Sequence, residues 1–177
     1  MNPYIYNQKM FYIIAIIIVI LDQITKLAII SYAQSQHVSF GSSITNWSGA
    51  LDIIYATNPG AAFGIFPDQR WVFIGISIIA CIGIVIYVTK YKASVDKWSN
   101  IGFALILGGA VGNLIDRIFR IEVVDFIDVH LGSYHWPAFN VADSAICVGV
   151  GLVIIALFLN TKSQKSEIRS QSLEVKK

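Results

Sequence analysis

Charged residues are scarce in this chain. They make up 14% of its 177 residues, against 55% hydrophobic residues, and the mean hydropathy is +0.64. A soluble domain of this length carries about 25% charged residues, so the composition excludes an ordinary soluble protein and indicates an integral membrane protein. Cysteine is scarce as well. Cys81 and Cys147 both lie inside apolar runs, which predicts two buried thiols and no disulfide.

Several signatures of catalysis are also missing. The chain has no Gly-x-Ser-x-Gly elbow and no His-Glu-x-x-His pair, which argues against the common serine and zinc hydrolases. His130 and His135, together with Asp125 and Asp128, match no established ligand spacing, so we expect no metal site there. We expect no cofactor and no nucleic-acid partner.

Four apolar segments are long enough to cross a bilayer, which takes about 20 residues. They cover residues 10–30, 71–89, 100–119 and 139–160. The first contains Asp22 and Lys26, where a cleavable signal peptide would be purely apolar, so we expect an uncleaved span. The sequence therefore predicts an α-helical membrane protein with one four-helix domain over residues 1–160. Residues 161–177 are polar and charged, which predicts a disordered cytoplasmic tail.

The distribution of lysine and arginine predicts the orientation in the membrane. One set of flanks holds nine of them: Lys9, Lys90, Lys92, Lys97, Lys162, Lys165, Arg169, Lys176 and Lys177. The other set holds three: Arg70, Arg117 and Arg120. Cytoplasmic flanks carry the excess of positive charge, so we expect both termini in the cytoplasm. Residues 31–70 and 120–138 then lie outside, where Ser43–Trp47 and Leu51–Ala56 predict two strands of a small sheet.

Acidic residues gather around the last external segment. Asn113 precedes Asp116 by three positions at the end of the third span, and Asn140 precedes Asp143 by three at the start of the fourth. Ionisable groups at the edge of hydrocarbon are costly and by default suggest function. The Asn140 and Asp143 pair also fits simple helix capping, which would fix the carboxylate without excluding catalysis.

The remaining polar residues fit structural as well as functional roles, and for Asn58 the sequence alone favours the structural one. Asp22 and Lys26, four residues apart, share a helix face and can simply pair. Asp116 lies beside Arg117, which suggests an ion pair and therefore a supporting role rather than proton donation. Asn58 precedes a run of small residues, which indicates either a turn or a hydrogen-bond donor to a bound group.

Two carboxylates remain as catalytic candidates. Asp125 is flanked by apolar residues in Val-Val-Asp-Phe, and desolvation of such an acid raises its pKa toward neutrality. The spans place Asp125 and Asp143 at the same outer membrane face. Carboxylates held close together share one proton, so one can activate water while the other protonates an amide carbonyl. This pattern predicts an aspartic protease. The alternative is a small transporter or proton-relay protein, although transporters often show internal repeats and none is visible here.

Five motifs in order resemble those of the bacterial lipoprotein signal peptidase family, also called signal peptidase II. They are Asp-Gln-Ile-Thr-Lys (22–26), Asn-Pro-Gly-Ala-Ala-Phe (58–63), Gly-Gly-Ala-Val-Gly-Asn-Leu-Ile-Asp-Arg (108–117), Val-Val-Asp-Phe (123–126) and Pro-Ala-Phe-Asn-Val-Ala-Asp (137–143). The resemblance runs from the first span through the last. It departs at Pro59, where the family commonly has threonine.

The resemblance implies an inner-membrane endopeptidase that cleaves diacylglyceryl-modified prolipoproteins before the lipidated cysteine. It implies that Asp125 and Asp143 form the catalytic dyad, on the extracytoplasmic side. The implied supporting or substrate-binding residues are Asn58, Asn113, Arg117, Asn140, Asp22, Lys26 and Asp116. It further implies a small extracytoplasmic β-cradle and a short extracytoplasmic helix over the site. We expect membrane lipid as a partner and a monomeric enzyme.

Overall fold

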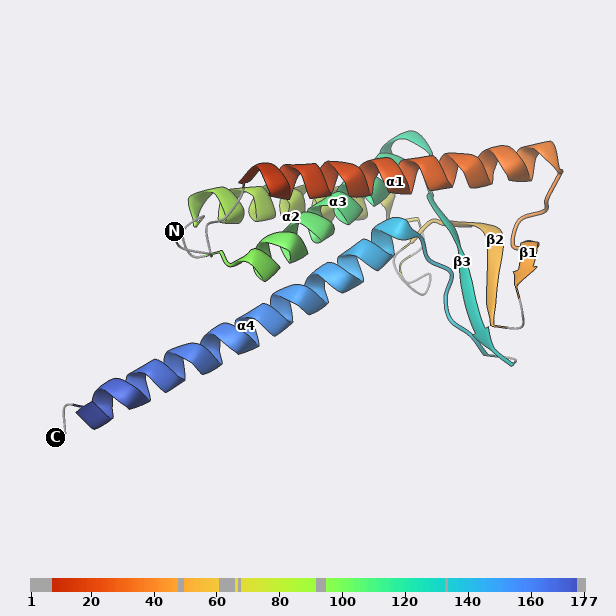
Figure 1. The fold of residues 1–177 in the computed structure, drawn as a ribbon. Coiled ribbons are helices and arrows are strands. Elements are labelled where there is room, and N and C mark those ends of the chain that lie inside the picture. The colour runs from red at the N-terminus through yellow and green to blue at the C-terminus, as the bar shows by residue number, and fades with distance from the viewer. Residues whose placement is uncertain are drawn as a thin grey trace.

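Four long helices form the body of the protein (Figure 1). The structure is a computed structural model that describes residues 8–47, 50–60, 66, 68–91, 95–132 and 134–174. The helices are α1 (Gln8–Ser35), α2 (Arg70–Lys90), α3 (Lys97–Phe119) and α4 (Val141–Glu174). Each contains a stretch long and apolar enough to cross a membrane. The four predicted membrane-spanning helices are therefore confirmed.

Helix α3 lies at the centre of the bundle, and half of its most apolar stretch is buried. It packs against α1, α2 and α4. Small residues allow this close packing. A Cβ atom added at Gly102 would lie 2.7 Å from the carbonyl oxygen of Gly149, and one added at Gly149 would lie 2.6 Å from that of Gly102. The backbones of α3 and α4 thus touch directly.

The outward faces of the helices are apolar instead of polar. Ile13, Ile16 and Ile24 of α1 are each more than half exposed, as is Ile79 of α2. In water such a surface would be unfavourable, whereas lipid tails solvate it without cost. The helices therefore present the surface that a bilayer requires.

An antiparallel sheet stands at one end of the bundle, next to the start of α4 (Figure 1). Its strands are β1 (Ser43–Trp47), β2 (Leu51–Asn58), β3 (Val123–Leu131) and β4 (Tyr134–His135), in that order. The first two strands match the sequence prediction, and β2 extends two residues further. The sheet joins both segments that were predicted to lie outside.

The second external segment differs from the expectation. The short helix predicted there is not found among its described residues, which form β3 and β4 instead. The sequence of β3 is Val-Val-Asp-Phe-Ile-Asp-Val-His-Leu. Its β-branched residues favour a strand, and β2 offers a free edge with which to pair.

The C-terminal tail also differs from the prediction. Residues 161–174 continue α4 as a helix, where the sequence predicted disorder. Lysine, glutamine, glutamate and arginine propagate a helix well, and the stretch contains no glycine or proline. Because the preceding span has already formed, no new helix nucleus is needed.

Candidate active site

Asp125 lies on β3, where it pairs with Ala56 of β2 and is bonded by Asn140, the residue before α4. It is 4% exposed. Its Oδ1 accepts a hydrogen bond from Asn140 Nδ2 at 2.7 Å, and its Oδ2 accepts one from Asn58 Nδ2 at 3.3 Å. Burial raises the pKa of Asp125 to about 7, and repulsion from Asp143 adds to this, while the two amide bonds act in the opposite direction. Asp125 can therefore hold a proton near neutral pH.

Asn58 is held in place by the turn that follows β2. Its Oδ1 accepts a hydrogen bond from the backbone N–H of Gly60 at 2.9 Å, the bond of an Asx turn. With its oxygen engaged there, the amide must present Nδ2 to Asp125. Pro59 sits inside this turn, where its missing N–H costs nothing. The motif continues into residues 61–65, which lie outside the described residues.

Asp143 occupies the first turn of α4. Its Oδ2 accepts from the backbone N–H of Asn140 at 3.2 Å, and its own N–H donates to Asn140 Oδ1 at 2.9 Å. This reciprocal pair satisfies two N–H groups at the helix start, as in a capping box. The carboxylate accepts its second bond at Oδ1, from Asn113 Nδ2 at 2.7 Å. Helix capping thus fixes the position of this carboxylate.

Two asparagine side chains connect the two carboxylates. Asn140, fully buried, bonds to Asp125 and also donates to Asn113 Oδ1 at 3.2 Å. Asn113 in turn bonds to Asp143. The chain of contacts is therefore Asp125, Asn140, Asn113, Asp143. It holds the two acids at a fixed separation although they come from a strand and a helix.

Lys26 determines which way the Asn113 amide points. Its Nζ donates to Asn113 Oδ1 at 2.9 Å, and because an ammonium group only donates, the contacting atom must be the amide oxygen. The amide nitrogen then faces Asp143. Lys26 Nζ also lies 2.9 Å from Asp22 Oδ2 and 2.8 Å from Asp116 Oδ2, so its three protons have three acceptors. The Asp22 and Lys26 pair predicted from the sequence is present.

The two supporting acids each hold a second element. Asp22 Oδ1 accepts from the N–H of Ala142 at the start of α4 at 3.0 Å, and Asp116 Oδ2 accepts from the N–H of Val124 on β3 at 3.2 Å. Asp22 and Asp116 are fully buried. Together with Lys26, they anchor the two backbone segments that carry the dyad candidates.

The position of Asp116 beside Arg117 in the sequence suggested that the two would pair, but they do not pair in the structure. The Asp116 side chain pairs with Arg120, one helical turn away, because adjacent residues on a helix point in different directions. Arg117 instead stacks over Phe73 and donates to the carbonyl oxygen of Gly60 at 3.2 Å. Arg117 also lines the same cavity as Asp125 and Asp143.

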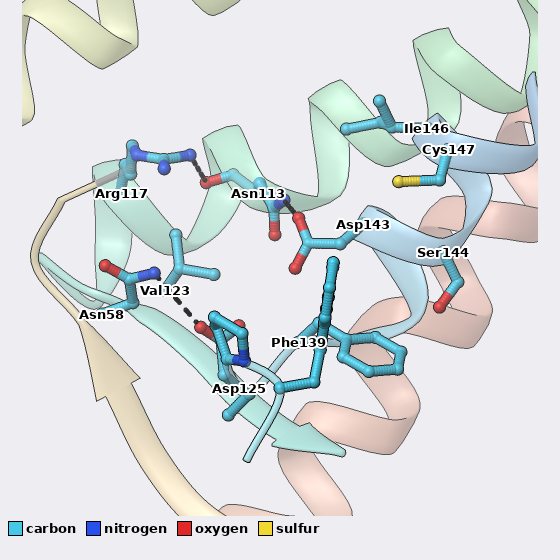
Figure 2. A pocket seen from close by; sticks show the side chains of 13 residues that line it. Asn58, Asn113, Arg117, Val123, Asp125, Phe139, Asp143, Ser144, Ile146 and Cys147 are labelled. Carbon is cyan, nitrogen blue, oxygen red and sulfur yellow. Dashed lines mark hydrogen bonds between the residues drawn. The ribbon is translucent and has the colours of Figure 1, made fainter. Parts of the chain in front are cut away.

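The two acids line one cavity of about 540 Å³. Figure 2 shows Asp125 and Asp143 pointing into this space from β3 and α4, with Asn58, Asn113 and Arg117 on the same side. The other lining residues are mostly apolar: Val123, Trp136, Pro137, Ala138, Phe139, Ser144, Ile146 and Cys147. A polar end and an apolar wall suit an amphipathic peptide segment.

Sequence reasoning missed three parts of this site. Arg120 and Gln23 complete the network around Asp116, since Arg120 donates to Gln23 Oε1 at 2.8 Å and Gln23 donates to Asp116 Oδ1 at 3.2 Å. Their spacing to Asp22 and Asp116 could have indicated this. Cys147 was predicted to be buried but is exposed in the cavity wall, because it lies one turn after Asp143. Cys81 is partly buried.

Comparison with known proteins identifies the family. The family model described as Signal peptidase (SPase) II matches residues 14–159. The chain is 45% identical to the lipoprotein signal peptidase of Halalkalibacterium halodurans over 157 residues, which cover 89% of this chain and 97% of that protein.

Two solved structures, both described as a bacterial membrane enzyme determined by the in meso method, share this fold. The one at 2.3 Å resolution has a TM-score of 0.77 and 34% identity, with 90% of this chain and 94% of the other covered. The one at 1.9 Å has a TM-score of 0.72 and 37% identity, with 87% and 96% covered. The buried acids and the four spans described above thus lie in a chain that belongs to the signal peptidase II family, a family of bacterial membrane aspartic proteases.

Proposed function

We propose that Asp125 and Asp143 are the catalytic dyad with which this chain removes the signal peptide of lipidated prolipoproteins. The observation that carries the proposal is the bridge of Asn140 and Asn113 between the buried carboxylate of Asp125 and the partly buried carboxylate of Asp143, on one cavity. Aspartic proteolysis requires such a pair to share a proton. The capping of Asp143 and the network around Lys26 both serve to keep that pair in place.

The two acids differ in surroundings, which suggests a division of roles. Asp143 accepts two N–H bonds at a helix start, where the helix dipole favours an anion. We therefore assign Asp143 the role of taking a proton from the attacking water. Asp125, with a pKa of about 7, holds a proton and gives it to the carbonyl oxygen as the water oxygen bonds to the carbonyl carbon.

The second half of the reaction returns both protons. Asp143 protonates the amide nitrogen as the carbon–nitrogen bond breaks, and Asp125 regains its proton from the hydroxyl group of the tetrahedral intermediate. Asn58 and Asn140 hold Asp125 through its protonated and ionised states. Arg117, whose guanidinium lines the cavity, stabilises negative charge and binds substrate carbonyl groups.

The apolar wall of the cavity suggests how the substrate is bound. Trp136, Phe139 and Ile146 face the space in front of the dyad and provide an apolar surface for the end of the signal peptide. The acyl chains of a diacylglyceryl cysteine would remain in the surrounding lipid, beside the exposed isoleucines of the helices. We propose that the enzyme works as a monomer whose helices are surrounded by membrane lipid.

The orientation is part of the same proposal. The sheet and the start of α4 lie at one end of the bundle, whereas the start of α1 and the end of α4 lie at the other (Figure 1). The cavity is at the first of these ends, because Asp125 of β3 and Asp143 at the start of α4 line it. Lys9, Lys90 and Lys97 lie in the helix ends remote from the sheet. The positive-inside rule then places both termini in the cytoplasm and the dyad on the extracytoplasmic side.

A substrate pair tests this function directly. A synthetic prolipoprotein segment with a diacylglyceryl cysteine and the same segment with serine at that position are incubated with the protein in lipid bicelles. Mass spectrometry should detect cleavage immediately before the modified cysteine and none in the serine peptide. Equal cleavage of both peptides would disprove the lipid requirement, and cleavage elsewhere would disprove the proposed specificity.

A further inference from the structure

A second cluster of ionisable side chains lies in the sheet, apart from the dyad. Asp52 on β2 and Asp128 on β3 are register partners across the two strands. His130 follows Asp128 by two positions, so it projects from the same face of β3. One carboxylate oxygen of each aspartate and one histidine nitrogen lie within 4.8 Å of one another. None of the three residues lines the cavity of Asp125 and Asp143.

The electrostatics of this cluster call for a cation. Asp52 and Asp128 are each only 9% exposed, and like charges directly opposite on paired strands are destabilising. Asp52 Oδ1 is shielded from solvent and has no hydrogen-bond partner within the described part of the chain. A buried carboxylate oxygen without a donor is costly, and a bound cation would satisfy it.

The distances fit a metal better than an ordinary ion pair. His130 Nε2 lies 3.3 Å from Asp52 Oδ2, whereas a charge-assisted N–H···O bond measures about 2.7–2.9 Å. Two ligands about 2.05 Å from a tetrahedral zinc ion are separated by about 3.3 Å. One imidazole and two carboxylates are a ligand set that zinc and similar divalent ions accept, with water completing the shell.

We propose that Asp52, Asp128 and His130 bind a divalent transition metal, with zinc as the best match. The ion would join β2 to β3 at the end of their ladder remote from Asn58 and Asp125. Its role is structural, because the site is separate from the reacting groups. The spacing rules that found no metal motif in the sequence missed it because Asp52 lies on a different strand.

The test uses the full-length protein in detergent, carrying a tag without histidine so that the tag cannot bind the metal. After chelation and removal of the chelator, zinc chloride is titrated by isothermal calorimetry, and the melting temperature is followed in parallel. Asp52→Asn and His130→Ala are compared with His37→Ala, a matched control whose side chain is exposed outside the cluster.

We expect one zinc ion per wild-type chain and a rise in its melting temperature on adding zinc. Loss of a ligand should weaken the affinity at least tenfold, so Asp52→Asn and His130→Ala should show a weaker Kd and a smaller rise. His37→Ala should match the wild type. Absence of saturable binding in the wild type overturns the proposal, as does equal affinity of the wild type and the His130→Ala variant. Either result would leave only an Asp52–His130 ion pair.

Discussion

Replacing Asp125 by asparagine should inactivate the enzyme and, above neutral pH, stabilise it. Burial is the main reason that the pKa of Asp125 rises from 3.8 to about 7. In the unfolded chain the acid ionises near its ordinary value. Below about pH 4 the acid is protonated in both states, and the full free energy of unfolding is present. As the pH rises from about 4 to about 7, the acid ionises only in the unfolded chain, so the free energy of unfolding falls. At pH 8 the folded wild type holds a buried charge that the variant lacks.

The size of the effect follows from the two pKa values. Each pH unit between them is worth about 1.4 kcal/mol, so a rise from 3.8 to about 7 corresponds to about 4 kcal/mol at pH 8. Against this, an asparagine at 125 can accept the bond from Asn140 but turns its own NH₂ group toward Asn58 Nδ2. That lost bond costs about 1–2 kcal/mol. The net stabilisation is about 2–3 kcal/mol at pH 8 and close to zero at pH 5.

The assay is thermal unfolding in detergent of the wild type and Asp125→Asn at pH 5 and pH 8, with peptide cleavage measured on the same samples. The control is Asp116→Asn, which takes a buried carboxylate away from Lys26 and Arg120. It should be destabilised by about 3 kcal/mol at both pH values, because charges are left uncompensated. If Asp125→Asn melts below the wild type at pH 8, the assignment of a buried, costly charge to Asp125 is wrong.

Three further predictions concern the surroundings of the dyad. Cleavage should fall about tenfold for each pH unit above about 7, because Asp125 loses the proton that it must donate; a rate that stays flat to pH 9 would contradict this. Lys26→Met should reduce kcat about 100-fold with little change in KM, since the Asn113 amide loses the contact that orients it; a change in KM alone would point to substrate binding instead. Gly112→Ala should cost about 1–3 kcal/mol in stability, because the added Cβ would lie 2.6 Å from a buried carboxylate oxygen, whereas Gly83→Ala, with open space around it, should unfold like the wild type.

The parts of the fold that depend on composition were predictable from the sequence. Four apolar runs can only be spans, because the bilayer leaves no other stable arrangement for them. The first two strands were also predictable, since short alternating segments lie between turn residues. The cap formed by Asn140 and Asp143 followed from their spacing.

Contacts between distant segments were less predictable. The sequence suggested that Asp116 pairs with its neighbour Arg117, but on the helix its side chain forms an ion pair with Arg120. Only the fold brings Lys26 to the same carboxylate. The cluster of Asp52, Asp128 and His130 depends on the register of β2 against β3. A single sequence fixes no register between strands this far apart, so no local pattern could reveal it.

Two expectations about secondary structure were wrong. The resemblance implied a short helix in the second external segment, but the described residues of that segment form β3 and β4, because β2 supplies a partner edge that the sequence does not display. The polar residues after Asn160 were predicted to be disordered from their charge, but they extend α4. Both errors come from judging a segment without the element to which it is attached.

The most direct test of the account compares single-turnover cleavage of the lipidated peptide by Asp125→Asn, Asp143→Asn and the double variant, each confirmed to be folded by thermal unfolding. Groups that share one proton act as a unit, so their losses should not add. Both single variants should therefore cleave as slowly as the double variant. Substantial turnover by either folded single variant, or losses that multiply in the double variant, would contradict it.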